Sequence, residues 1–532
     1  MTEHHSTDHR PTAQTEGHRY DVIVAGGGNA ALTAALAAHD AGARVLVLEA
    51  ASRELRGGNS RFTGAIFRVT HDGLDSLKPI LDPSNEQWYP RVSVAPYSSE
   101  DYAADWNRTS EGRQDPELVR ITIERSLETV RWMHSKGVKW ELTANKLVDP
   151  SKVDDGTTIT LAPGGALRTL HEGVGLIDDL YAAVEATDIE VWYDSPAHDL
   201  IATGSTVHGI RVRKGAEFVD VLGTVILGCG GFESNPEMRL RYLGPGWDLV
   251  KVRGTRFNMG QMHTKSIAAG AQPVGHWGGA HAVPIDAAAP PVGDLRITDK
   301  MSRYSYPYAL LLNRDGQRFI DEGEDNVFLT YAKTGWAVRA QPGGIAYQIF
   351  DQKTAHLLEP RYSTGTPVVA DTLEELADKL GVNKRGMLQT VADYNTAVAS
   401  DAEDRADPFT LDGVSAEPVG QPAKSNWART ITEGPFVCYP VMCGITFTYG
   451  GIKIDGDARV ITQEGKPMTG LYATGEITGG FFFHNYGAGA GLVRGAVFGR
   501  IAGTNAAAES HTDSSVAAQA TAGERETAGV AS

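Results

Sequence analysis

The chain has 532 residues, is 41% hydrophobic and carries a formal net charge of -17. Its length and apolar content predict a globular protein with two cores, and an acidic balance without any Lys/Arg-rich run excludes nucleic acid as a partner. Three cysteines are too few for a disulfide framework, and no metal site is expected. No apolar run has the roughly 20 residues of a membrane span or the pattern of a signal peptide, so we expect a cytoplasmic protein.

The first fifty residues predict a dinucleotide site. Residues 20–24 (YDVIV) and 43–50 (ARVLVLEA) read as buried parallel strands, and the segment between them reads as a glycine turn leading into an Ala-rich helix. The turn matches the G-x-G-x-x-A pattern, in which glycines allow close approach to a pyrophosphate and the helix N-terminus holds it. An acid follows at the end of the second strand, where it would bond a ribose. The residues expected to contact the cofactor here are Gly26, Gly28, Asn29, Ala30, Ala31, Glu49 and Ala50.

Three later segments favour FAD over NAD as the dinucleotide. They are RGGNSRFTG at 56–64, an apolar strand ending in GCGGFESN at 223–235, and GLYATGEITGG followed by FFFHNYGAGAGLVRG within 470–503. Their glycines would bring the main chain against the pyrophosphate and the flavin. The cofactor contacts expected in these segments are Gly57, Gly58, Asn59, Ser60, Gly230, Gly231, Gly475, Glu476, Gly491 and Leu492.

These segments resemble the fumarate-reductase-type flavoproteins, the FAD-binding 2 superfamily. Within it, stretches such as GGFESN, QRFIDEGED and GITFTYGGIK are most similar to FAD-dependent tricarballylate dehydrogenases. The resemblance implies an α/β fold: a Rossmann-like, glutathione-reductase-type FAD-binding domain in two sequence pieces, with an inserted α+β cap domain. It also implies non-covalent FAD. We expect a disordered tail at 1–18, the FAD-binding domain at 19–271 and 441–510, the cap at 272–440, and a second disordered tail at 511–532.

The substrate site departs from both groups. Phe447, Tyr486 and Asn326 stand where fumarate reductases carry a histidine and two arginines, which makes fumarate reduction an unexpected activity. Compared with the tricarballylate enzymes, cationic and polar positions are replaced by Phe62, Gly64, Ala65 and Met442, although three carboxylates need cations to offset desolvation. The residues expected to line the substrate are Phe62, Arg68, Arg256, Phe447 and His484.

The YGAGA turn suggests a way to polarise a substrate oxygen. It is similar to a turn in the 3-ketosteroid dehydrogenases, and this similarity implies that Tyr486 and the amide of Ala490 bind a carbonyl, with Asn485 fixing the turn. Either Tyr331 or His281 would move the proton, because both match residues of the tricarballylate group.

Three functions follow from these residues. The leading hypothesis is an FAD-dependent dehydrogenase or reductase that acts on a C–C bond α,β to a carboxylate or carbonyl, with hydride transfer to flavin N5. One alternative is a 3-ketosteroid-type or other apolar-ketone dehydrogenase, and another is a non-catalytic flavin electron carrier. The expected partners are a small-molecule substrate and an external electron acceptor, which is a quinone-linked protein, a soluble carrier or dioxygen.

Overall fold

The computed structural model describes residues 18–144, 158–398 and 410–529, with side chains described as far as residue 512. The expected tail at 1–18 lies outside the described residues except for His18, which begins the first strand. Within these ranges no helix combines the length and the apolar character that crossing a membrane requires.

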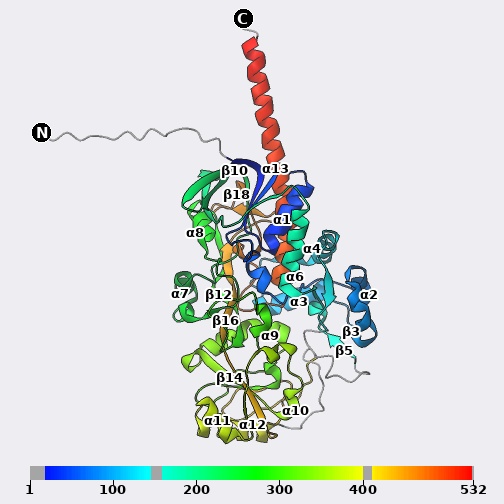
Figure 1. The fold of residues 1–532 in the computed structure, drawn as a ribbon, viewed down its shortest axis with the longest axis vertical. Helices are drawn as coiled ribbons and strands as arrows, with labels where there is room; N and C mark the ends of the chain where they lie inside the picture. The colour runs from blue at the N-terminus through cyan, green and yellow to red at the C-terminus, as the bar shows by residue number, and fades with distance from the viewer. Residues whose placement is uncertain (1–17, 145–157, 399–409, 530–532) are drawn as a thin grey trace, which may run out of the picture.

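An eight-stranded sheet forms the upper part of the molecule in Figure 1. Strands β10, β1, β2 and β7 run parallel, as the buried apolar runs predict, and β18 joins β10 in parallel. The remaining strands β8, β9 and β17 extend one side. The strand bounds are β1 His18–Ala25, β2 Val45–Leu48, β7 Glu190–Trp192, β8 Ala197–Thr203, β9 Thr206–Lys214, β10 Glu217–Leu227, β17 Arg459–Ile461 and β18 Pro467–Ala473.

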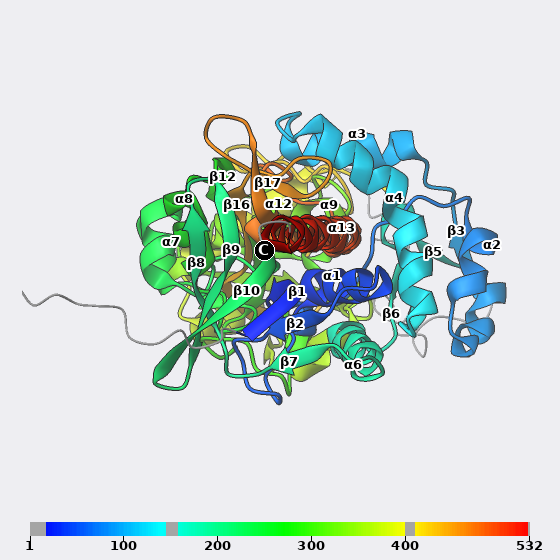
Figure 2. The ribbon, with the colours of Figure 1, turned by 90° about the horizontal axis from the view of Figure 1, so that it is seen from above.

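Two helices that are far apart in sequence, α1 (Asn29–Asp40) and α13 (Ala490–Gly529), lie side by side on this sheet (Figure 2). Three glycines of α13, spaced by four residues, face α1. A Cβ atom on Gly495 would lie 3.2 Å from the Ala30 Cβ, and one on Gly503 only 2.2 Å from the Ala34 carbonyl oxygen. The glycine spacing therefore lets the two helix backbones touch, and it fixes both helix N-termini at the same end of the sheet.

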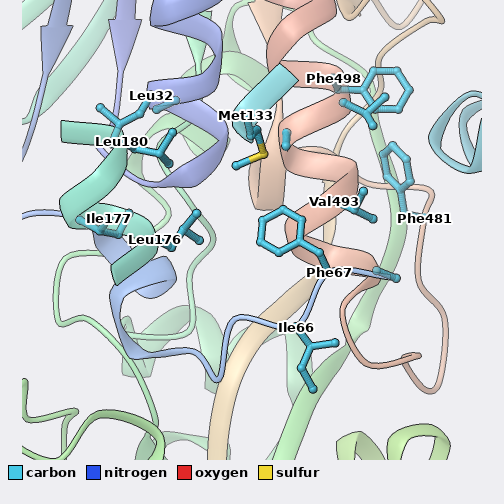
Figure 3. Close-up of a cluster of buried hydrophobic side chains, with 14 of the residues drawn as sticks. Leu32, Ile66, Phe67, Met133, Leu176, Ile177, Leu180, Phe481, Val493 and Phe498 are labelled. Atoms are coloured by element: carbon cyan, nitrogen blue, oxygen red, sulfur yellow. The ribbon is translucent and has the colours of Figure 1, made fainter. Parts of the chain in front are cut away.

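A hydrophobic core surrounds these helices. Figure 3 shows Leu32 of α1 near Leu180 of α6 (Glu172–Glu185), with Met133 of α4 (Pro116–Ser135) and Val493 of α13 on the other side; all four are fully buried. Burying such side chains stabilises the fold by about 1.5–3 kcal/mol each. The smaller elements of this half are α2 Leu74–Leu77, α3 Ser99–Ser110, α7 Pro236–Leu243, α8 Gln261–Ala268 and the two-stranded pairs β3 Val92–Val94 with β5 Ile159–Leu161 and β4 Trp140–Leu142 with β6 Leu167–Thr169.

A second, six-stranded sheet is built around β16 (Phe436–Ile452), which pairs with β11, β12, β14 and β15. β16 is one continuous strand across residues 440 and 441, where the sequence suggested a boundary between cap and FAD domain. Its partners and the helices packed near them are β11 Lys251–Val252, β12 Pro273–Asp286, β13 Leu310–Leu312, β14 Ile345–Phe350, β15 Val368–Ala370, α9 Val327–Arg339, α10 Gln352–Ala355, α11 Leu373–Leu380 and α12 Lys384–Ala397. This α+β part lies below the first sheet in Figure 1.

The C-terminal helix is longer than expected. α13 continues to Gly529, beyond residue 511 where we expected a disordered tail, and Figure 1 shows it projecting from the first sheet. The segment is rich in alanine, which has the strongest intrinsic helix preference and explains why a polar sequence adopts this form.

Candidate cofactor and substrate site

A cavity of about 590 Å³ runs from the β1–α1 turn to an aromatic cluster beside β12 and β16. The glycine segments form one end of its wall. Of the predicted cofactor residues, Gly26, Gly28, Asn29, Ala30, Glu49, Ala50, Gly58, Asn59, Ser60, Gly230, Gly231, Gly475, Glu476, Gly491 and Leu492 line it. Ala31 and Gly57 lie behind the wall, where Ala31 packs against Gly228 and Gly57 against Ile177.

The β1–α1 turn requires glycine. Gly26 has a φ of +117°, and a Cβ atom there would lie 2.3 Å from the Gly228 carbonyl oxygen. Asn29 then begins α1 and connects three segments, because its N–H donates to the Ser60 hydroxyl at 3.1 Å and its side-chain amide donates to the Leu492 carbonyl at 2.9 Å. The Asn29 Oδ1 atom is buried and accepts no hydrogen bond within the described part of the chain.

Glu49 lies at the end of β2, where the sequence placed the ribose acid. Its carboxylate accepts from the N–H groups of Ala51 at 2.8 Å and Gly57 at 3.3 Å. Burial raises the pKa of Glu49 above its ordinary value, and these N–H groups offset part of the rise. The carboxylate is thus fixed in direction at the cavity wall.

The half-buried carboxyl group of Glu476 lies further along the wall, beside the buried carboxyl group of Glu233. The side-chain amides of Asn59 and Asn258 both donate to Glu233 Oε1, at 2.5 and 2.6 Å, and the Thr448 N–H donates to Glu476 Oε1 at 2.8 Å. Burial, followed by the neighbouring Glu476, raises the pKa of Glu233 well above its ordinary value. Burial raises the pKa of Glu476 as well.

These features fit a bound FAD. The glycine edges allow close contact with a pyrophosphate, the N-terminus of α1 favours its charge, and Glu49 is placed for a hydroxyl. The unpaired Asn29 Oδ1 and the unpaired Nε of Arg494, both buried, are polar atoms that a ligand would satisfy.

The other end of the cavity is aromatic. His281 on β12 lies 4.9 to 5.0 Å, ring centre to ring centre, from Tyr331 of α9, Phe447 of β16 and Tyr486. A register shift between His281 and Ala282 interrupts the β12–β16 pairing at this point, as bulges often do where a side chain is redirected. The structure thus brings the two predicted proton carriers and two further predicted residues, Phe447 and Tyr486, around one space.

Tyr486 is supported by the first turn of α13. The Gly491 N–H donates to the Tyr486 hydroxyl at 3.1 Å. The Ala490 amide, which we expected to bind a substrate oxygen, instead donates to the Gly487 carbonyl at 3.2 Å, and Ala490 does not line the cavity. The tight turn uses that amide internally, so the expected role of Ala490 is corrected to a part of the turn.

The YGAGA turn is also held from outside. The Asn485 side-chain amide donates to the Leu329 carbonyl at 2.6 Å and the Ala488 N–H to the Phe328 carbonyl at 2.9 Å, both on α9. Asn485 thus fixes the turn, as predicted.

Four residues that we expected to line the substrate do not line the cavity. Arg68 is buried in an ion pair with Asp105 and donates to the Ala488 carbonyl at 2.9 Å, so it supports the turn from behind. Arg256 is exposed, His484 lies at the surface beside His276, and Phe62 is buried against Gly293. The direction in which each of these side chains points depends on the path of its loop or strand, and sequence spacing does not determine that path in irregular segments.

The cavity also has residues that the sequence reading missed. Arg253, Asp299 and Tyr304 line its aromatic end. Arg253 belongs to the same VRGTRFN stretch as Arg256, and only its position directly after β11 (Lys251–Val252) distinguishes the two. Among the described residues, no group of three or more His, Cys, Asp or Glu side chains is arranged to hold a metal ion.

The fold and the cavity are typical of a flavoprotein whose cofactor is a dinucleotide. The comparisons agree: the family described as FAD binding domain matches residues 21–492, and the chain belongs to this FAD-binding 2 family. FAD is therefore its cofactor.

Two curated relatives align with more than nine-tenths of this chain. The probable fumarate reductase Ifc3 of Shewanella frigidimarina is 28% identical over 499 residues, covering 91% of this chain and 74% of that protein. The 4-oxocyclohexanecarboxylate 2-dehydrogenase of Sinomonas cyclohexanicum is 26% identical, covering 94% of this chain and 95% of that enzyme. The chain spans about half the length, 51%, of the NADH:acrylate oxidoreductase of Vibrio harveyi, to which it is 27% identical.

A solved structure shares the fold. The 3-ketosteroid delta1-dehydrogenase of Sterolibacterium denitrificans aligns with a TM-score of 0.69 at 21% identity, covering 92% of this chain and all of that one. The protein is thus an FAD-dependent oxidoreductase that acts on C=C or CH–CH groups.

Proposed function

We propose that the protein forms or reduces a C–C double bond α,β to a carbonyl oxygen, and that Tyr486 polarises this oxygen. The observation that carries the proposal is the hydrogen bond from the Gly491 N–H to the Tyr486 hydroxyl in the wall of the aromatic end of the cavity. Since the hydroxyl already accepts a bond, its own proton remains to be donated to a substrate oxygen. The N-terminus of α13 favours the negative charge that develops there.

FAD, when bound, supplies the two-electron chemistry, taking up or returning a hydride at the substrate carbon. The chain's own residues handle the proton. Burial raises the pKa of Tyr331 well above its ordinary value, so its phenol stays protonated and can donate. Burial, and then the charge of Arg253, lowers the pKa of His281 well below its ordinary value, so its imidazole is neutral and its unpaired Nδ1 can accept.

The substrate expected from these walls is compact and carries a ketone. The dehydrogenase of Sinomonas cyclohexanicum, named for a ring ketone, supports this choice. Tricarballylate, the substrate of the dehydrogenases that the sequence motifs resemble most, has less support, because Arg68 and Arg256 do not reach the cavity and Phe447 and Tyr486 occupy its aromatic end. A wholly apolar ketone, such as a 3-ketosteroid, is the second candidate, favoured by the same aromatic walls.

Anaerobic mixing of the yellow protein with 4-oxocyclohexanecarboxylate, tricarballylate and a 3-ketosteroid tests the proposal. We expect loss of the flavin absorbance with a ketone, and a much slower loss in Tyr486→Phe. Reduction by tricarballylate alone, unchanged in Tyr486→Phe, would contradict it, and a flavin reducible by a protein donor but by none of these compounds would favour the electron carrier. Reoxidation of the reduced protein by a quinone analogue, a soluble dye and dioxygen would then rank the three proposed classes of acceptor.

A further inference from the structure

Arg253 presents a positively charged group to the aromatic end of the cavity. Its side chain is 10% exposed, and its three nitrogens are held by three different residues. Nε donates to the Ser302 hydroxyl at 2.9 Å, one terminal nitrogen donates to the Thr446 hydroxyl at 3.1 Å, and the other is paired with Asp299. The guanidinium is therefore rigid before any ligand arrives.

This arrangement leaves Arg253 able to bind an anion. A guanidinium has five N–H groups, and three of them are used in these contacts. The Asp299 carboxylate that is paired with Arg253 is also paired with Arg361 at 2.9 Å. Arg361 in turn pairs with Glu359 at 2.8 Å, so positive and negative charges alternate along this network, and Arg253 and Asp299 are its members that line the cavity.

Arg253 and Tyr486 both lie near Tyr331 and line the same cavity. The Tyr331 ring is 6.3 Å from that of Tyr486, and both Arg253 and Tyr486 act electrostatically on its hydroxyl. The ring centre of Tyr304 lies 4.9 Å from that of Tyr331, and the charge of Arg253 offsets part of the rise that burial causes in the pKa of Tyr304. The aromatic end of the cavity thus combines the Tyr486 hydroxyl, the Tyr331 ring and a cation, Arg253.

Two other arginines among the described cavity residues, Arg213 and Arg494, do not compete for this place. Arg213 is exposed and lies opposite Phe218 in the β9–β10 pairing, and the Phe218 ring contacts His198. Arg494 donates to Thr478 and is influenced by Glu476, on the cofactor side of the wall.

We infer that Arg253 binds a carboxylate of the substrate, so that the protein acts on oxo acids whose ketone lies at Tyr486 and whose carboxylate lies at Arg253. The ketone end rests on the proposed function; the carboxylate end rests on Arg253 itself. A wholly apolar ketone would leave buried guanidinium N–H groups without a new acceptor, and a tricarboxylate would place its other charges against Phe447 and a neutral His281.

Ligand binding to the oxidised holoprotein tests the inference without requiring turnover. The probes are 4-oxocyclohexanecarboxylate and its methyl ester, which share the ring ketone and differ in charge, and dissociation constants are read from the shift of the flavin spectrum. We expect wild type to bind the acid about 10- to 100-fold more tightly than the ester. Arg253→Gln should lose this preference while its affinity for the ester stays within about twofold.

Two further variants make the result specific. Arg256→Gln removes an exposed guanidinium three residues away and should leave both affinities unchanged. Arg253→Lys keeps the charge without the fork and should retain part of the preference, which also covers the case in which Arg253→Gln does not fold.

Equal binding of acid and ester by wild type, or equal weakening of both in Arg253→Gln, would overturn the inference. Failure of the proposed function would give a different result. The acid would still bind in preference to the ester, but neither compound would reduce the flavin, or the flavin of Tyr486→Phe would be reduced as fast as that of wild type.

Discussion

The main-chain N–H of Gly491 donates to the hydroxyl of Tyr486 across 3.1 Å, so the residue that we propose to polarise the substrate is supported by the first turn of the helix that follows it. Tyr486→Phe removes this hydroxyl and preserves the ring packing. We expect flavin reduction to slow by about 10²- to 10³-fold, with FAD content unchanged. The matched control is Tyr449→Phe, because the Tyr449 hydroxyl is buried nearby, has no hydrogen-bond partner among the described residues and does not line the cavity. A comparable slowing in both variants would assign the effect to packing.

Asn29→Asp places a negative charge where a pyrophosphate is expected and replaces the amide that donates to the Leu492 carbonyl. Both changes oppose cofactor binding, and an unmade buried hydrogen bond costs about 1–3 kcal/mol. The dissociation constant of FAD from the apoprotein, measured by fluorescence, should rise at least tenfold. Thr504→Asp adds the same charge at an exposed position of α13 and should leave it unchanged; unaltered FAD affinity in Asn29→Asp would place the pyrophosphate elsewhere.

His263 makes stability depend on pH. Burial lowers its pKa from 6.5 to about 4. The unfolded chain therefore binds more protons than the folded one between these values, so this contribution is complete above pH 6.5 and is lost as the pH falls toward 4. The loss amounts to about 1.5 kcal/mol between pH 6.5 and 5.

Urea unfolding of wild type and His263→Gln at both pH values measures this contribution. The glutamine does not titrate, so its variant should lose less stability on acidification than wild type does, whatever its stability at pH 7. Identical pH dependence in the two proteins would show that folding does not change the pKa of His263.

The contact between α1 and α13 predicts a sharp steric effect. In Gly503→Ala the new methyl group would meet the Ala34 carbonyl oxygen, a main-chain atom that cannot turn aside. We expect a loss of about 1–3 kcal/mol in stability and weaker FAD retention, since α1 is displaced. Gly278→Ala is the control, because its Cβ would have an ordinary contact of 3.6 Å. Thermal melts of both variants measure this difference, and equal melting temperatures would contradict the predicted steric clash.

Sequence reasoning predicted the cofactor half of this protein well, for a physical reason. The β1–α1 turn, Glu49 and the glycine segments are local patterns whose geometry follows from a few consecutive residues, and the parallel sheet and family were confirmed. Helices α11 and α12 follow a local pattern as well, because residues 371–398 carry apolar side chains at i, i+3 and i+4 spacing.

The substrate half was less predictable, because its residues come from irregular segments whose direction depends on tertiary packing. Arg68 and Arg253 illustrate the difficulty. Both are arginines near glycine motifs, yet one turns away to pair with Asp105 and the other reaches the cavity from the end of a two-residue strand. No spacing rule separates them, whereas the positions of β11 and α3 do.

One consequence of α13 concerns how this protein can change. The helix begins at the YGAGA turn, and its residues Gly495, Gly499 and Gly503 pack against α1, which begins at the β1–α1 turn. Inserting or deleting one residue between Gly491 and Gly495 would rotate one set against the other by about 100°. New specificities should therefore arise by substitution of side chains. Insertions and deletions should be tolerated only where they keep Gly491 and the three later glycines of α13 in the same rotational alignment.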